Sequence, residues 1–172
     1  MPASRKTRWL PGLMCSAILS TGTVQAGQDA IWPPKLEIHH VLLQTSFYTT
    51  HFDPEPDHHN QQELIGLELH NAQHWLVGGA RFLNSFNQES FFLYAGREFP
   101  LWQPNEAFTV RAKLTAGLLH GYRGEHRDKI PLNRLGTAPA ALPSIGLQWQ
   151  RFETDLILFG TAGAMVTGGI RF

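Results

Sequence analysis

Apolar and polar residues alternate along much of this chain, with the period of two that is typical of β-strands carrying one apolar and one polar face. The clearest stretch is residues 107–120, where Phe108, Val110, Ala112, Leu114, Ala116 and Leu118 alternate with Thr109, Arg111, Lys113 and Thr115. Shorter stretches of strand-forming residues lie between clusters of turn-forming residues. We therefore predict eight strands, at residues 36–51, 63–71, 75–85, 90–98, 107–120, 139–149, 153–159 and 163–172.

This pattern predicts an all-β fold, an eight-stranded antiparallel outer-membrane β-barrel with alternating lipid-facing and lumen-facing residues. An even number of strands places both ends of the barrel in the periplasm. A lumen of this size holds side chains or one slim ligand, but no water channel. A soluble eight-stranded barrel is the alternative. The predicted extracellular loops are 52–62, 86–89, 121–138 and 160–162, and the predicted periplasmic segments are 72–74, 99–106 and 150–152.

The first residues have the three-part layout of a secretory signal peptide. Three basic residues precede an apolar core at residues 10–19, and residues 24–26 form a small-residue cleavage site. The apolar core is shorter than the about 20 residues that a membrane helix needs. The last residue is Phe172, and outer-membrane barrels commonly end on an aromatic residue. We expect a signal peptide at 1–26 and a transmembrane barrel at 27–172, in the outer membrane of a Gram-negative bacterium.

The charge and the cysteine content exclude some classes of protein. Without residues 1–26, the chain keeps 11 of its 14 Lys and Arg residues and all 14 Asp and Glu residues, a net charge of about −3. This balance gives no basic excess for a nucleic-acid partner. The single cysteine, Cys15, lies in the signal peptide, so we expect no disulfide. We expect a monomer stabilised by strand pairing.

Two further groups of side chains suit a barrel. Glu98, Arg111 and Lys113 are expected to form a polar plug in the periplasmic half of the lumen. An aromatic girdle is expected at the inner membrane interface, formed by Trp32, Trp75, Trp102, Trp149 and Phe172.

The candidate chemistry lies at the extracellular rim. His51 ends the first predicted strand, and Asn84 and Ser85 end the third, so the topology places them at the same height. A serine hydroxyl beside a histidine is the minimal unit for nucleophilic or general-base acyl chemistry. The alternative is that they are ordinary loop residues, which serine and histidine at strand ends usually are.

Two pairs of neighbouring histidines are candidates for a metal site. His58 and His59 lie in a loop whose spacing matches no metal motif, and a solvated loop is the better interpretation. His39 and His40 alternate along a strand, so we expect them to point to opposite faces and not to bind one ion. We expect neither a metal nor another cofactor.

The segment 81–87, R-F-L-N-S-F-N, resembles the F-K-D-S-W-N segment of the PagP family of lipid A palmitoyltransferases. Further segments follow in the family's order, so the resemblance covers about residues 63–172. These are 93–96 (family A-G-Y-G), 114–117 (F-T-A-G), 129–132 (Y-I-P-L) and 142–146 (within L-P-L-A-S-V-G-Y). The chain departs from the family in the segment before the barrel, where residues 27–34 are too short for the family's amphipathic helix, and at two site positions. Asn84 stands where the family has a catalytic Asp. The family's catalytic His lies in a W-H-A-R-F segment. Aligning the Phe of that segment with Phe47 places Gln44 at the position of the catalytic His. His51 takes that position only if the alignment register is shifted.

The resemblance implies an enzyme that moves a palmitoyl chain from a glycerophospholipid to lipid A in the outer leaflet. Ser85 would be the central catalytic residue, as the nucleophile or as a positioned hydroxyl, and His51 would be the general base. Asn84 would orient these groups or donate to the developing oxyanion. A non-enzymatic barrel for adhesion or membrane structure and a lipid A deacylase remain the alternatives.

The resemblance also implies where the acyl chain binds. The family's acyl-length ruler is a glycine on the floor of an apolar upper lumen, and it maps to Gly96. The family's acyl chain enters laterally, where prolines interrupt the pairing of two strands. Pro139 and Pro143 fall near the matching opening, since proline has no N–H to donate to a strand ladder.

Overall fold

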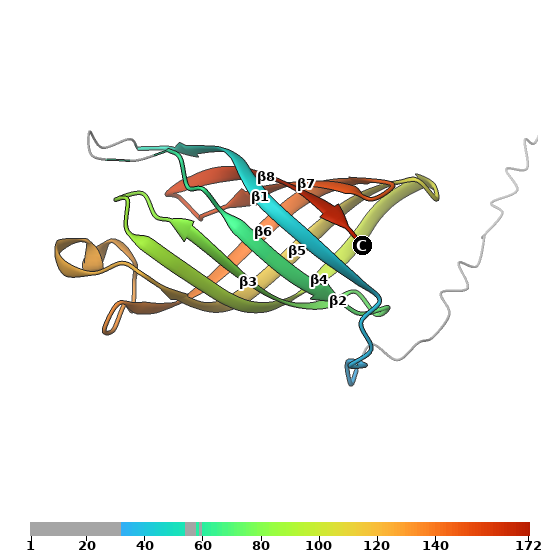
Figure 1. The fold of residues 1–172 in the computed structure, drawn as a ribbon, viewed down its shortest axis with the longest axis horizontal. Helices are drawn as coiled ribbons and strands as arrows, with labels where there is room; N and C mark the ends of the chain where they lie inside the picture. The colour runs from blue at the N-terminus through green and yellow to red at the C-terminus, as the bar shows by residue number, and fades with distance from the viewer. Residues whose placement is uncertain (1–31, 54–57, 59) are drawn as a thin grey trace, which may run out of the picture.

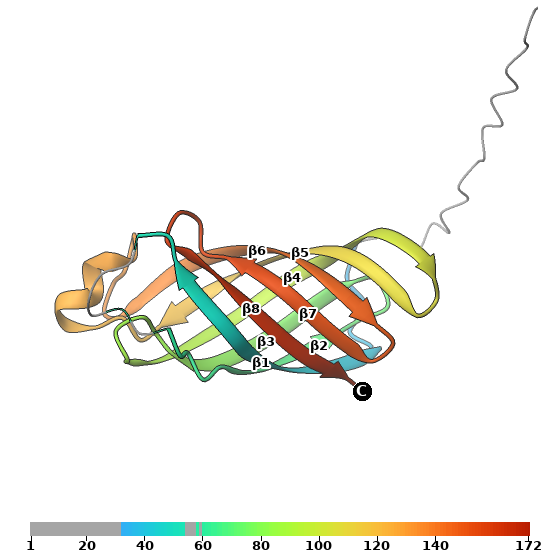
Figure 2. The same cartoon turned by 90° about the horizontal axis from the view of Figure 1, so that it is seen from above.

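The computed structural model describes residues 32–53, 58 and 60–172. The predicted signal peptide lies outside the described residues. The strands form a closed barrel in sequence order, with each strand antiparallel to its neighbours and β1 paired with β8 (Figures 1 and 2). The predicted eight-stranded antiparallel barrel is therefore confirmed. Its strands are β1 (His40–His51), β2 (Ile65–His70), β3 (Trp75–Leu83), β4 (Glu89–Asn105), β5 (Phe108–His120), β6 (Thr137–Trp149), β7 (Phe152–Leu158) and β8 (Gly163–Arg171).

The largest difference from the predicted strands is in β4. Residues 99–106 contain two prolines and were predicted to turn the chain, but β4 continues through them to Asn105. The pairing with β5 shifts register between Pro100 and Trp102, which is how a strand accommodates residues that break a regular ladder. The turn itself is only Glu106 and Ala107.

The outer wall of the barrel is apolar. Each strand contributes exposed apolar side chains, for example Leu43, Leu67, Val77, Leu93, Leu114, Ile145, Leu156 and Ile170. A continuous surface of this kind suits lipid and is far larger than the apolar patches of soluble proteins. The closed barrel with its apolar wall places the protein in the outer membrane, and the soluble barrel can be set aside.

Among the described residues, no helix has the length and apolar character that a membrane crossing requires.

The two ends of the barrel differ. The start of β1, the end of β8 and three short turns lie at one end, and the longer loops lie at the other (Figure 1). The even strand number makes the first end periplasmic. The predicted aromatic girdle lies there, since Trp32 packs edge-on against Trp75 at 6.2 Å, Trp102 and Trp149 are near the ends of β4 and β6, and Phe172 follows β8.

Charged residues fill the periplasmic half of the lumen, as predicted for Glu98, Arg111 and Lys113. Arg111 is 2 % exposed and donates to Glu98 at 2.6 Å, to Asp155 at 3.0 Å and to Glu153. Lys113 pairs with Glu68 at 2.9 Å and with Asp155 at 3.3 Å, and His70 lies 2.8 Å from Glu68. These ion pairs form the predicted polar plug below the midpoint of the lumen. Charges this deeply buried are tolerated there because they are mutually paired.

Candidate functional site

His51 faces the lumen because β1 contains a β-bulge. In the lower part of β1 the inward positions are even-numbered, and Leu42 and Gln44 are buried there. The register with β8 then shifts between Ser46 and Tyr48. Above the shift the inward positions are odd-numbered, so Thr49 is 2 % exposed and His51 is half-buried. The extra residue reverses the faces of the strand, and without it His51 would face lipid.

Ser85 lies in the tight turn between β3 and β4, which Asn84 stabilises. The backbone N–H of Asn87 donates to the carbonyl oxygen of Asn84 at 2.9 Å, and the N–H of Asn84 donates to the carbonyl of Gln88 at 2.9 Å. The Asn84 side chain is 1 % exposed, and its Oδ1 accepts the backbone N–H groups of Phe86 and Gln88, each at 3.0 Å. Side-chain acceptors of this kind fix turns by replacing backbone partners.

This geometry bears on the role expected for Asn84. Its Nδ2 donates to Oε1 of Gln88 at 3.3 Å, so its amide is used within the turn and is not directed at a ligand. The Asn84 side chain therefore holds the turn that carries Ser85, and its expected role toward an oxyanion stays a prediction. A carboxylate could accept the same two backbone N–H groups, which gives a physical reason why Asn84 can stand where the resembling family has an aspartate.

Three side chains form a hydrogen-bonded row at the rim. Nε2 of His51 lies 2.6 Å from Oγ of Ser85, and Nδ1 of His51 lies 2.9 Å from Oδ1 of Asn60. An amide oxygen only accepts, so Nδ1 carries the hydrogen and Nε2 is left to accept the proton of the serine hydroxyl. This is the order of nucleophile, base and orienting group that activates a serine.

Asn60 is a site residue that the sequence analysis missed. It lies nine positions after His51, in a loop rich in polar residues, and no motif marks it. The position of Asn60 beside His51 depends on loop conformation, which the alternation of apolar and polar residues along strands does not reveal.

Two further residues contact this row. The phenol of Tyr122 contacts both the side chain and the backbone of Ser85. Burial raises the pKa of the Tyr122 phenol more than these contacts lower it, so the hydroxyl keeps its proton and can donate. The centroid of the His58 ring lies 4.3 Å from that of His51 and 5.4 Å from that of Phe86, so this loop residue packs against the row at the rim.

An apolar section of the lumen lies between the rim and the charged plug. It is formed by the buried residues Leu76, Phe92 and Tyr94, against which Ala80, Phe82, Leu119, Ala140 and Leu142 pack. The Tyr94 ring stacks on Phe92 with centroids 4.7 Å apart, and its hydroxyl donates to Glu68 at 2.9 Å. Tyr94 therefore lies where the apolar section meets the charges of the plug.

Gly96, the expected acyl-length ruler, faces the lumen as predicted but lies on the plug side of Tyr94. A Cβ at Gly96 would meet the carbonyl oxygen of Leu114 and, at 3.0 Å, the Cα of Thr115. The absence of a side chain is thus required by the close approach of β5. Tyr94, two residues before Gly96, contacts both the apolar section and Glu68, and the role of Gly96 as the acyl-length ruler stays a prediction.

Pro139 and Pro143 lie where the strand pairing is interrupted. Only the lower part of β6, from Ser144 to Trp149, pairs with β7, whereas residues 137–143 pair with β5 alone. Both prolines are exposed on the outer wall. A strand edge without a partner is where proline is tolerated, because no N–H is lost. The interruption is at the place expected for lateral entry of an acyl chain.

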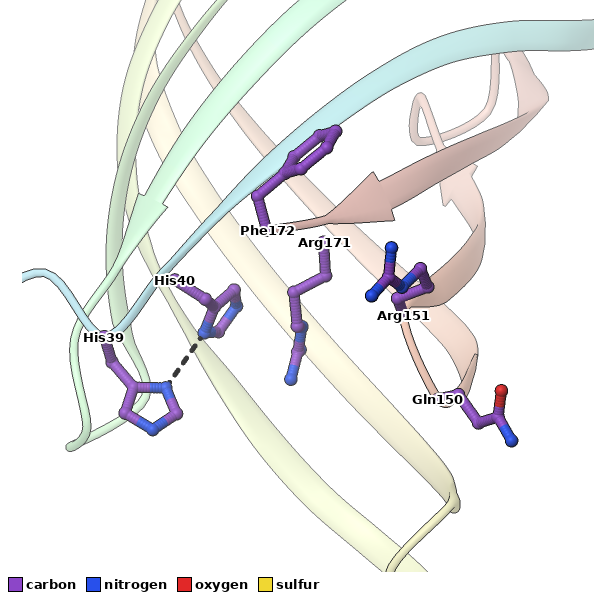
Figure 3. A pocket seen from close by; sticks show the side chains of 6 residues that line it. All are labelled: His39, His40, Gln150, Arg151, Arg171 and Phe172. Carbon is purple, nitrogen blue, oxygen red and sulfur yellow. Dashed lines mark hydrogen bonds between the residues drawn. The ribbon is translucent and has the colours of Figure 1, made fainter.

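The histidines at the periplasmic end behave differently from the prediction. His39 precedes the first residue of β1, so strand alternation does not apply to it, and its Nδ1 lies 3.2 Å from Nδ1 of His40 (Figure 3). The expectation that they point to opposite faces was wrong. They line a pocket of about 520 Å³ with Arg151, Arg171 and Phe172, at the opposite end of the barrel from Ser85. Within residues 32–53, 58 and 60–172, no three His, Cys, Asp or Glu side chains form a group that could hold a metal ion.

Comparison with protein-family models gives no match, and neither does comparison with curated protein sequences. Among solved structures, the outer membrane protein Ail of Yersinia pestis in a phospholipid bilayer nanodisc is similar, with 16 % identity and a TM-score of 0.42 over 79 % of this chain and 100 % of Ail. Ail in complex with the heparin analogue sucrose octasulfate matches with 15 % identity and a TM-score of 0.36, over 77 % of this chain and 96 % of Ail.

Proposed function

We propose that this barrel is an acyltransferase that moves a palmitoyl chain from a glycerophospholipid to lipid A in the outer leaflet. The observation that carries the proposal is the 2.6 Å contact between Nε2 of His51 and Oγ of Ser85 at the extracellular rim, directly above an apolar section of the lumen. A hydroxyl activated by a base and an apolar lumen for a hydrocarbon chain are the two parts that acyl transfer needs.

The first half of the reaction cleaves the donor ester. His51 takes the proton of Ser85 through Nε2 while Oγ attacks the ester carbonyl of the glycerophospholipid. The carbonyl oxygen becomes an oxyanion, to which the neutral Tyr122 hydroxyl donates. When the tetrahedral intermediate collapses, the ester C–O bond breaks, and His51 returns the proton to the lysophospholipid oxygen. Ser85 then carries the acyl chain as an ester.

The second half repeats these steps with the acceptor. A hydroxyl of lipid A gives its proton to Nε2 of His51 and attacks the acyl-Ser85 carbonyl, and collapse of the second intermediate returns the proton to Oγ of Ser85. The hydrogen bond from Nδ1 of His51 to Asn60 keeps the imidazole in the tautomer that both halves require.

The apolar section above Tyr94 suits the palmitoyl chain, since each buried methylene contributes about 0.8 kcal/mol to binding. The interrupted pairing of residues 137–143 with β7 lies in the extracellular half of the wall, where a chain from the surrounding lipid can enter the lumen. Pro139 and Pro143 keep this edge unpaired, in agreement with the substrate-binding role that the family resemblance implies for them.

The resemblance to the PagP family left Gln44 or His51 as the counterpart of the family's histidine. Gln44 is buried in the plug, where it donates to Glu68 at 3.2 Å and to Tyr94 at 3.0 Å. His51 is beside Ser85 at the rim, so His51 is the residue placed to act as the base.

Mass spectrometry of lipid A from cells with and without the protein tests the proposal. An acyltransferase adds one palmitoyl chain to lipid A, and this addition disappears in Ser85→Ala. A lipid A deacylase would use the same residues with water as the acceptor, and lipid A would then lose a chain. Unchanged lipid A from cells that contain the folded barrel would rule out both enzymes and leave the non-enzymatic barrel of the adhesion or structural kind.

A further inference from the structure

The β5–β6 loop, residues 121–136, carries a group of exposed cations at the extracellular rim. Its four basic side chains are those of Arg123, Arg127, Lys129 and Arg134. Only Glu125 and Asp128 are acidic, so four cations against two acids leave two positive charges with His126 neutral. Residues 27–172 as a whole are slightly acidic, so this loop differs in charge from the rest of the barrel.

The loop is fastened to the turn that carries Ser85. The ring of Phe86, the residue after Ser85, stacks on His126 with centroids 3.9 Å apart and 6° between planes, and Nζ of Lys129 lies 5.5 Å from the Phe86 centroid. Gln88 adds two hydrogen bonds, because its Nε2 donates to the carbonyl of Arg123 at 3.2 Å and its Oε1 accepts the Arg123 N–H at 3.1 Å. These contacts therefore hold the cations of the loop beside the turn that carries Ser85.

The ion pairs within the loop do not neutralise it. Arg127 lies 3.6 Å from Asp128, and both side chains are more than half exposed. An exposed pair of this kind is weak and exchanges readily with another anion. The loop also exposes Leu132 and Leu135, at 75 % and 94 %. Basic residues interleaved with exposed leucines are typical of a surface that lies against charged lipid headgroups.

We propose that the β5–β6 loop binds the phosphate groups of lipid A and thereby places the acceptor beside Ser85. The inference rests on the proposed function and names the part of the acceptor that is recognised. A phosphate monoester carries about −1.5 to −2 charges near pH 7, and arginine matches its oxygens with two parallel hydrogen bonds. Several cations in one loop suit the two phosphates of lipid A better than the single diester of a glycerophospholipid, whose charge is −1 and is often cancelled by an ammonium group.

A binding experiment tests this without any turnover. Ser85→Ala protein in detergent micelles is titrated with bis-phosphorylated lipid A, with chemically dephosphorylated lipid A and with phosphatidylglycerol. We expect a preference of at least about tenfold for the bis-phosphorylated form, and this preference should weaken between about 50 and about 200 mM salt because salt screens phosphate contacts. Replacing the three outer cations in the combined variant Arg127→Gln, Lys129→Gln and Arg134→Gln should remove this preference.

The matched control is Arg151→Gln, which removes an exposed cation at the periplasmic end and should keep the full preference. Equal binding of phosphorylated and dephosphorylated lipid A by the Ser85→Ala protein would overturn the proposal, and this comparison needs no loop variant to fold. Tighter binding of phosphatidylglycerol than of bis-phosphorylated lipid A would overturn it in favour of the donor. Failure of acyl transfer alone would leave the binding result intact, so the two proposals can fail separately.

Discussion

Nε2 of His51 lies 2.6 Å from Oγ of Ser85, although β2 separates β1 from the strand that leads to Ser85. Two local features produce this contact. The bulge after Ser46 turns His51 into the lumen, and the side chain of Asn84 fixes the turn that presents Ser85. The first prediction tests whether this contact is catalytic.

Ser85→Ala and His51→Ala should each fold and insert but lose acyl transfer by at least about 10³-fold, because the hydroxyl and its base act as one unit. For the same reason the double variant should be no worse than either single one. Transfer is measured by the appearance of palmitoylated lipid A. His39→Ala, at the periplasmic end, is the control and should keep wild-type activity. Wild-type transfer by Ser85→Ala would show that the contact has no catalytic role.

Asn60→Ala should lower kcat about tenfold and change KM little, since Asn60 orients His51 and does not touch substrate. The effect is modest because Asn60 is exposed and water can replace its oxygen. Asn60→Asp keeps an acceptor beside Nδ1 of His51 and should restore activity. If Asn60→Asp were as impaired as Asn60→Ala, the orienting role would be wrong.

Tyr122→Phe should lower kcat by roughly 10²-fold, the usual effect of losing one oxyanion donor. Burial raises the pKa of the Tyr122 phenol above its ordinary value of 10.0, so the hydroxyl remains a donor as the pH rises through that value. The wild-type rate, followed between about pH 7 and 9.5, should therefore show no loss caused by ionisation of Tyr122. A Tyr122→Phe variant with an unchanged kcat would remove this residue from the mechanism.

The fold could be predicted from the sequence because each barrel strand alternates apolar and polar residues. In β5, Arg111 and Lys113 alternate with lipid-facing apolar residues, and this alternation predicted both the strand and the polar plug. The end of β4 could not be read in the same way. Pro100 and Pro104 resemble turn residues when taken locally, and only their place beside the long β5 keeps them in a strand.

The candidate site was only partly predictable. The heights of Ser85 and His51 followed from counting strands, but the inward orientation of His51 depends on a bulge that the alternation of residues does not show. Asn60 and Tyr122 come from two different loops, and their approach to Ser85 is set by loop conformation. Contacts of this kind depend on tertiary structure and leave no periodic pattern in the sequence.

The plug should be essential to stability. Arg111→Met leaves Glu98, Glu153 and Asp155 without their shared partner in a buried site, which should lower the free energy of unfolding by about 3–5 kcal/mol. Arg81→Met is the matched control, because its pair with Glu89 is 53 % exposed and contributes at most about 1 kcal/mol. Urea unfolding in detergent, followed by the shift of the folded band in electrophoresis, compares the two. Equal stability of both variants would contradict the structural role of the plug.

The last prediction concerns the length of the transferred chain. If the acyl chain ends above Tyr94, a larger side chain in the apolar section should shorten it, so Ala140→Leu, which adds three carbons beside the cluster, should displace roughly three methylenes. Ala141→Leu adds the same carbons on the outer wall and should leave the chain length unchanged. Gly96→Met should instead destabilise the barrel, because its Cβ would meet the backbone of β5 at Leu114. Mass spectrometry of the modified lipid A reports the length of the transferred chain. A stable Gly96→Met barrel that transfers a shorter chain would show that the acyl chain ends at Gly96 and not above Tyr94.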